Sequence, residues 1–192
     1  IDEAELDDAN DRVQRINLTI DDLPEGWVAE APIEEVTSVV TECTEYGVDE
    51  NVVAKAASDR FSLIVDQGGL GLDTTSGYLE SVETAEMLMG ELGSTDFADC
   101  ATEQLLSAEG VTVEGQLNQF DGMPELGDEV VALQGDFAMS DTSGASVQLS
   151  AIIVAIRTDQ VITTVSATAV DTPGDEQLLY QVLDLVAERQ EG

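Results

Sequence analysis

Histidine is absent from the 192-residue sequence, and lysine occurs once, at Lys55. The lack of histidine excludes the Ser-His-Asp triad and every metal centre built on imidazole. Only 6 Lys and Arg residues stand against 41 Asp and Glu, which gives a formal net charge of -35. Nucleic acid is therefore excluded as a partner, because binding of phosphates requires clustered basic side chains. An anionic membrane surface is disfavoured for the same reason.

Several signature patterns are also missing. The longest apolar run, Ala151 to Ile156, has the length of a strand, so no segment is predicted to span a membrane. A CxxC pair is absent, which argues against a zinc site or a thioredoxin-like redox role, and so are GxSxG and the P-loop. Gly68 to Gly71 is rich in glycine but has no lysine after it, so a loop is favoured over a phosphate cradle.

Hydrophobic residues nevertheless make up 43% of the chain, and aromatic residues 4%. This is enough apolar material for one folded domain with an aliphatic core and an acidic surface. So many uncompensated charges repel one another unless salt screens them, which favours a marine or halophilic source over an acidic protein that is indifferent to salt.

The chain opens on Ile1 with an acidic stretch over residues 1–15. We expect these residues to form a solvated tether or a frayed helix, followed by a single α+β domain over residues 16–192. An acidic leader of this kind favours the trimmed end of a signal peptide, lipoprotein signal or membrane anchor. An arbitrary boundary in a cytosolic protein is the alternative.

Two cysteines, Cys43 and Cys100, lie 57 positions apart. An even count suits one disulfide, which would contribute roughly 4 kcal/mol by closing so long a loop and would indicate an oxidising compartment. A pair of unbonded core thiols is the alternative.

The first half of the chain gives mixed signals. Residues 16–20 alternate as a short strand, and a turn at Pro24 and Gly26 then places Trp27 in the core. Further strands are expected over 36–40 and 60–65, with a flexible glycine-rich loop over 66–77. Two helices follow: one over 82–92 that is stopped by a left-handed Gly93, and a second that is capped by Ser94 or Thr95.

From residue 111 onward the hydrophobic period changes to two. Four strands are predicted over 111–120, 129–140, 146–157 and 161–170, and their short connections require an antiparallel meander. Thr172 is the expected N-cap of a last helix. The predicted fold class is α+β: a twisted antiparallel β-sheet, with a C-terminal four-strand meander, flanked by a helical pair and a C-terminal helix.

Candidate sites are few. Paired carboxylates can act as a hydrolase, but among so many acids no pair can be chosen. The candidate calcium segments are Asp7 to Asp11 and Asp66 to Asp73, yet the first has Arg12 where an EF-hand needs glycine and the second offers two carboxylates. We therefore assign no catalytic residue, no metal ligand, no cofactor and no ligand-binding residue. Trp27 is interpreted as a core residue rather than a binding-site aromatic.

Four segments together carry a resemblance: DLPEGW, TAEMLMGELGSTDFADCATEQL, LGDEVVAL and IRTDQVITTVSA. In this order and spacing they resemble small actinobacterial secreted lipoproteins, including the extracellular sensor domain of mycobacterial PknH-type serine/threonine kinases. The resemblance covers roughly residues 16–189. It implies an α+β domain outside the membrane that binds a ligand in a cleft, and it matches Cys100 to a disulfide position. That family usually has two disulfides, whereas this chain can form one.

The functional hypothesis is a non-enzymatic extracytoplasmic domain, secreted or attached to the cell envelope by an N-terminal lipid anchor. It would act as a ligand-binding or sensor module, with an unknown small ligand or an envelope protein as partner. A lipid-carrier lipoprotein and an envelope protein-interaction scaffold are the alternatives, and a carboxylate-based hydrolase is a third.

Salt should stabilise this protein. Because screening of the net charge of -35 weakens self-repulsion, the midpoint of thermal unfolding should rise between low salt and about 1 M NaCl. Calorimetry at several NaCl concentrations measures this midpoint. A midpoint that stays level or falls would contradict the halophilic interpretation.

Overall fold

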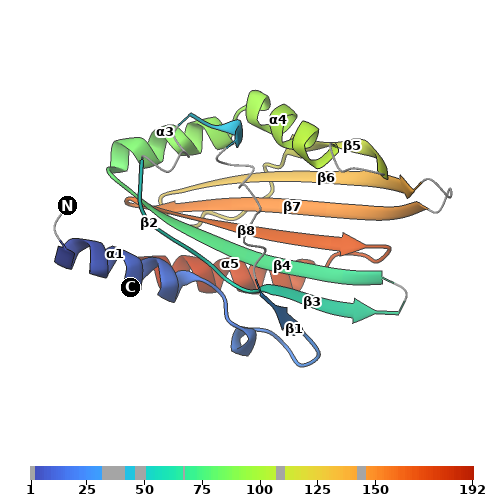
Figure 1. Ribbon diagram of the computed structural model, residues 1–192, viewed down its shortest axis with the longest axis horizontal. Coiled ribbons are helices and arrows are strands. Elements are labelled where there is room, and N and C mark those ends of the chain that lie inside the picture. The colour runs from blue at the N-terminus through green and yellow to red at the C-terminus, as the bar shows by residue number, and fades with distance from the viewer. Residues whose placement is uncertain (1–2, 32–41, 46–50, 67, 107–110, 142–145) are drawn as a thin grey trace.

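The computed structural model describes residues 3–31, 42–45, 51–66, 68–106, 111–141 and 146–192. Its centre is an eight-stranded antiparallel sheet with the order β1-β3-β4-β8-β7-β6-β5, in which β2 also pairs with β4. Figure 1 shows helices α3 and α4 on one face of this twisted sheet and α1 and α5 on the other. The α+β class predicted from the sequence is confirmed. The strand predicted over 36–40 lies outside the described residues.

The predicted meander is present in full. It consists of β5 (Val111–Gln119), β6 (Glu129–Asp141), β7 (Ser146–Thr158) and β8 (Val161–Val170), each paired with the next in the chain. In β7, Ala155 and Val154 point to opposite faces and are both buried. This strand is therefore covered on both sides, as its continuous apolar run predicts.

The glycine-rich segment predicted as a loop is instead a strand, β4 (Gly68–Leu79), in the middle of the sheet. The prediction was wrong because glycine in a strand can also mark a close approach between neighbouring chains. A Cβ atom on Gly71 would collide with Oγ1 of Thr168 on β8, and one on Gly68 would collide with the carbonyl oxygen of Val170. Glycine at these positions lets β4 and β8 pair along their whole length.

Two short strands share the other edge of β4. The strand β2 (Val52–Ala57) pairs with its second half, and β3 (Arg60–Val65), predicted from the sequence, pairs with its first half. Ser58 bridges the break, since its N–H donates to Thr74 O at 2.8 Å and its Oγ accepts from Thr74 N at 2.9 Å. The short strand β1 (Val28–Glu30) then pairs with β3 and ends the sheet.

The predicted helical pair is α3 (Val82–Leu92) and α4 (Thr95–Leu106). Ser94 caps α4, as one of the two predicted caps, by accepting a hydrogen bond from Phe97 N at 3.1 Å. Gly93 ends α3 with φ of -80°, so the expected left-handed stop is not used. The two helices bury one aliphatic cluster against the sheet: Ala85, Leu88, Met89, Leu92, Phe97, Ala98 and Ala101 from the helices, and Leu117, Leu133, Phe137 and Ala155 from the strands.

The C-terminal helix α5 (Glu176–Glu191) packs on the opposite face of the sheet. Its N-cap is Asp175 rather than the predicted Thr172, because the Asp175 carboxylate accepts a hydrogen bond from Leu178 N at 3.0 Å. The helix contributes Leu179, Val182, Leu183, Val186 and Ala187 to a second core cluster with Val154, Ile156, Val161 and Val165.

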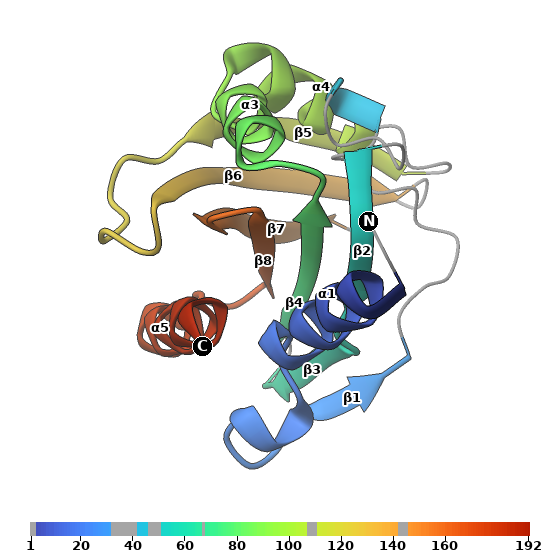
Figure 2. The same ribbon diagram turned by 90° about the vertical axis from the view of Figure 1, so that its left-hand side faces the viewer.

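Residues 1–15 were expected to form a solvated tether or a frayed helix, and from Glu3 onward they belong to the helix α1 (Glu3–Ile16), which packs on β2 and β4 rather than lying in solvent. Ala9, Val13 and Ile16 form its buried stripe, and each is at most 2% exposed. The acidic residues around this short stripe hid it from the sequence analysis. Figure 2 shows α1 lying across β2 and β4, beside α5 rather than over it.

The strand expected over residues 16–20 is also absent. Ile16 ends α1, and the chain then turns into the short 3-10 helix η1 (Ile20–Asp22). Thr19 and Asp22 fix this turn, because the N–H and Oγ1 of Thr19 donate to Asp22 Oδ2 at 2.8 and 3.0 Å. The alternating pattern arose because Leu18 is buried as well as Ile16, although neither lies in a sheet.

Below α1 and α5 the sheet carries buried polar residues in place of aliphatic ones. Leu18 N donates to Thr74 Oγ1 at 3.0 Å, and Ser76 Oγ donates to Asn17 Oδ1 at 2.9 Å. The Nδ2 atom of Asn17 is buried and has no hydrogen-bond partner within the described residues. These contacts attach the end of α1 to β4.

Gln190 attaches α5 to the same region. Its side chain is 0% exposed, and its Nε2 atom donates to Thr163 Oγ1 at 2.8 Å and to Ile156 O at 3.1 Å. Thr163 in turn contacts Ser76 across the sheet at 3.0 Å. We call Asn17, Thr74, Ser76, Thr163 and Gln190 the polar cluster.

Two arginines reinforce the polar cluster from outside. Arg189 forms a two-pronged pair with Asp22, with nitrogen–oxygen distances of 2.6 and 3.0 Å, and also donates to Asn17 O at 3.1 Å. Arg12 of α1 donates to Gln190 O at 2.9 Å. Burial raises the pKa of Asp22, but the hydrogen bonds from Arg189 and Thr19 outweigh it and hold the pKa below its usual value.

Replacing Gln190 should cost more stability than a buried apolar contact alone. In Gln190→Ala, Thr163 and the carbonyl of Ile156 lose their buried donor, so the free energy of unfolding should fall by about 2–4 kcal/mol. Gln181→Ala, at an exposed position of the same helix, should change it by less than about 0.5 kcal/mol. Urea unfolding of both variants gives the comparison, and equal losses would contradict the role of the polar cluster.

Candidate functional site

A pocket opens between the sheet and the first turns of α5, at the end of the sheet away from the polar cluster. Its floor is formed by neighbouring positions in register on β6, β7, β8 and β4. One row across these strands is Gln134, Ile152, Ala167 and Leu72, and in the next row Ser150, Ala169 and Leu70 line the pocket. The alanines on β8 leave the space that Val161 and Val165 fill farther along the same strand.

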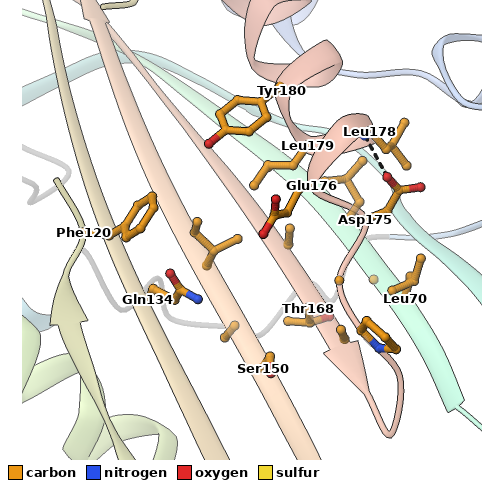
Figure 3. A pocket seen from close by; sticks show the side chains of 18 of the residues that line it. Leu70, Phe120, Gln134, Ser150, Thr168, Asp175, Glu176, Leu178, Leu179 and Tyr180 are labelled. Carbon is orange, nitrogen blue, oxygen red and sulfur yellow. Dashed lines mark hydrogen bonds between the residues drawn. The ribbon is translucent and has the colours of Figure 1, made fainter. Parts of the chain in front are cut away.

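The walls come from segments that are distant in sequence. Trp27 follows the turn after η1, Phe120 and Met123 belong to the connection between β5 and β6, and Leu179 and Tyr180 belong to α5. Figure 3 shows Phe120 and Tyr180 on the same side of the pocket, with Leu70 on the opposite side. The pocket has a volume of about 280 Å³ and is open to solvent on one side. The lining is largely apolar, which is typical of small-molecule sites.

The pocket has few polar groups, and its charged side chains are all acidic. Ser150 Oγ donates to the carboxylate of Asp136 at 2.6 Å, so an acid stands behind the floor. The Asp175 carboxylate caps α5, and Figure 3 shows it turned toward Leu178. Glu176 lies above the strands of the floor, with its carboxylate directed into the pocket. The two carboxylates thus lie at the start of α5, whereas Gln134 lies on β6, across the pocket from Asp175.

The cysteines form the predicted disulfide. Cys43 and Cys100 are bonded, with their Cα atoms 5.7 Å apart. The bond joins the segment at residues 42–45 to α4, on the face of the sheet that carries α3. It therefore braces the face opposite the pocket and contributes no group to it.

Neither calcium candidate gathers its acids around one point. Asp7 to Asp11 lies within α1, and Asp66 and Asp73 are separated by five residues of extended strand. Among the residues that the structure describes, no cluster of three or more acidic or cysteine side chains is placed to hold a metal ion. The described helices also include none that is both long enough and apolar enough to cross a bilayer.

One carboxylate is set apart by its environment, namely Asp73 on β4. Burial raises its pKa above the usual value, although the nearby charge of Arg60 and a hydrogen bond with Ser166 act in the opposite direction. Its neighbour Leu72 packs under α5, so Asp73 points to the other face of the sheet. The acid with the raised pKa is therefore not among the acids of the pocket, where a pair of catalytic carboxylates would be needed.

The sequence analysis missed most of the pocket. Trp27 is 9% exposed, so it is the core residue that was expected, but it also lines the pocket. Phe120, Glu176 and Tyr180 carried no motif that would single them out. The available signal was the pair Ala167 and Ala169, which are small residues at inward positions of a strand that otherwise carries valine.

Fold and site together describe an α+β domain with a single-sheet core and a small pocket under its last helix. No protein-family model matches the sequence, and no curated protein matches it. The structure is similar to the extracellular domain of PknH from Mycobacterium tuberculosis, with a TM-score of 0.49, 10% identity, and coverage of 96% of this chain and 97% of that chain. It is also similar to LpqN, involved in cell envelope biogenesis of Mycobacterium tuberculosis, with a TM-score of 0.38, 11% identity, and coverage of 86% and 78%. The first is the type of domain that the sequence resembles.

Asp73→Asn should stabilise the protein at neutral pH. Because burial raises the folded-state pKa of Asp73, its contribution favours folding at low pH and is lost as the pH rises through that pKa. The variant should therefore unfold at a higher urea concentration than the wild type at pH 7, with a smaller difference below the usual value of 3.8. Asp184→Asn, at an exposed position of α5, makes the same change in net charge. Equal stabilisation by both variants would show that only net charge matters.

Proposed function

We propose that this chain is a non-enzymatic, extracytoplasmic ligand-binding domain whose binding site is the pocket between the sheet and the start of α5. The observation that carries the proposal is an open pocket of about 280 Å³ with a largely apolar floor and a few polar groups at its edges. Proteins usually fill such space, because an unfilled cavity costs stability in proportion to its volume. Here the largest side chains on the inward face of β8 stop where the pocket begins.

The size of the pocket bears on the type of ligand. Small-molecule sites enclose roughly 300–1,000 Å³, and this pocket lies at the lower limit of that range. A single short alkyl chain or one ring system suits such a volume. A carrier of long-chain lipids needs a larger apolar cavity, so the volume supports a sensor-like module over a lipid carrier.

The extracytoplasmic location is supported by the disulfide. Disulfides persist in oxidising environments and are rare in the cytosol, where thiols are kept reduced. The bond between Cys43 and Cys100 closes a loop across 57 positions, so it restrains a large part of the unfolded chain. A domain stabilised in this way suits the cell envelope or the medium.

The other hypotheses have weaker support. A protein-contact scaffold would use the exposed Ile64 and Val28 at the β1–β3 edge, which are 85% and 58% exposed. Two side chains are few for a stable interface, which normally buries about 800 Å² on each partner. A carboxylate hydrolase would need a second acid near one with a raised pKa, and Asp73 lies on the face away from the pocket.

Trp27, the one tryptophan of the chain, allows ligand entry to be measured directly. Decanol, a neutral amphiphile, should bind with one-to-one stoichiometry and change the emission of Trp27, because both occupy the same pocket. Ala167→Leu should weaken binding by about tenfold or more, since the larger side chain rises from the floor into the space the ligand needs.

Ala57→Leu is the matched control, since it makes the same substitution at an exposed position of β2. It should leave decanol binding unchanged. The proposal fails if decanol does not change the Trp27 emission, or if Ala167→Leu and Ala57→Leu bind it equally well.

A further inference from the structure

The charge around the pocket indicates which ligands it can accept, and this inference rests on the proposed function. All six basic residues lie in the described part of the chain, and none of them lines the pocket. Two carboxylates, Asp175 and Glu176, do line it, and Asp136 contacts the floor through Ser150. An anionic ligand would enter this site without a cationic side chain to meet it.

The start of α5 is the one source of positive potential, because a helix N-terminus carries roughly half a positive charge. That potential is already compensated. The Asp175 carboxylate accepts the N–H of Leu178, and Glu176 occupies the first turn. With two full negative charges against about half a positive one, the balance at the rim of the pocket is negative.

Glu176 is the acid most available to a ligand. Within the described residues it forms no ion pair, and Figure 3 shows its carboxylate above the floor, between the helix and the strands. Arg189, the basic residue of the same helix, is engaged with Asp22 near the other end. The charge of Glu176 is therefore free to attract a cation in the pocket.

Aromatic rings add a second element of cation recognition. Trp27, Phe120 and Tyr180 all line the pocket, and Figure 3 shows the rings of Phe120 and Tyr180 on the side toward which Glu176 extends. The face of an aromatic ring attracts ammonium groups, with an energy of roughly 0.5–2 kcal/mol for each contact. Rings combined with a nearby carboxylate are a chemistry that recognises amines and quaternary ammonium groups.

We propose that the pocket binds a cationic amphiphile, namely an amine or quaternary ammonium group attached to a short apolar body. The apolar body lies on the floor formed by Leu70, Leu72, Ile152 and the β8 alanines. The cationic group lies at the rim, next to Glu176 and the rings of Phe120 and Tyr180. In this arrangement the carboxylate of Glu176 is paired with the cationic group of the ligand.

Three probes with the same alkyl chain test the proposal: decyltrimethylammonium, decanol and decyl sulfate, each below its micellar concentration. Binding is followed by Trp27 emission and calorimetry at about 0.15 M and about 1 M NaCl, where the Debye length is roughly 8 and 3 Å. The high-salt series removes the general attraction of cations to an acidic protein. The ammonium probe should bind about tenfold more tightly than decanol at both salt concentrations, and decyl sulfate most weakly.

Two charge-matched variants separate the site from the overall charge. Glu176→Gln should reduce the preference for the ammonium probe over decanol by about fivefold or more, without weakening decanol. Glu188→Gln changes the net charge equally, at an exposed position near the other end of α5, and should leave the preference unchanged.

The outcomes distinguish this inference from the function on which it rests. Equal binding of decanol and the ammonium probe, tighter binding of decyl sulfate, or equal effects of the two variants would overturn the cationic specificity and leave the pocket as a binding site. No binding of any of the three probes would overturn the proposed function together with this inference.

Discussion

The hydrogen bonds of Gln190 determine how one whole face of this protein is built. A fully buried amide side chain must find partners, and Gln190 finds them on β7 and β8. In doing so it fixes the last turn of α5 at one end of the sheet. The middle of the helix packs on aliphatic side chains of the sheet. Its first turn lies above small residues of β8, and the pocket forms there. From the last turn of α5 to its first, the sheet face beneath the helix therefore carries the polar cluster, then the aliphatic cluster, and then the pocket.

The few cations of the chain are used to maintain this arrangement. Arg189 and Arg12 hold the ends of α5 and α1 together through Asp22 and the backbone of Gln190. Arg157, which is 8% exposed, lies within 4 Å of Glu86, Asp128 and Glu129 where β7 ends near α3. In a protein with 41 acids and 6 bases, basic side chains with structural roles leave the pocket without any. Arg12, Arg157 and Arg189 thus make their contacts away from the pocket, and none of the six bases lines it.

Local pattern predicted the elements whose two faces differ clearly. The strand β8 alternates along its length, β7 has a continuous apolar run, and α5 repeats its apolar positions at helical spacing, so all three were found from the sequence. The strand β4 was missed because glycine marks both loops and close strand contacts, and only the pairing with Thr168 distinguishes them. The packing of α1 on the sheet was missed because three buried apolar residues among many acids are a weak signal.

The pocket itself was beyond local reasoning. Its floor joins residues from four strands that become neighbours only through register, and its walls add Trp27, Phe120 and α5. Helix capping was predicted to within a few residues, since Asp175 rather than Thr172 caps α5. A small error of that kind matters here, because the cap decides which carboxylate is engaged by the helix and which one faces the pocket.

The two ends of α5 are attached to the sheet in different ways: the last turn by hydrogen bonds and an ion pair, and the first turn by apolar contacts. In the last turn, Gln190 forms hydrogen bonds with β7 and β8, and Arg189 forms hydrogen bonds with Asn17 and Asp22. The first turn carries Leu178 and Leu179, which pack on the core cluster and line the pocket. The last turn also holds α1 through Arg12, so the helix that covers the pocket and the first helix of the chain share one set of hydrogen bonds.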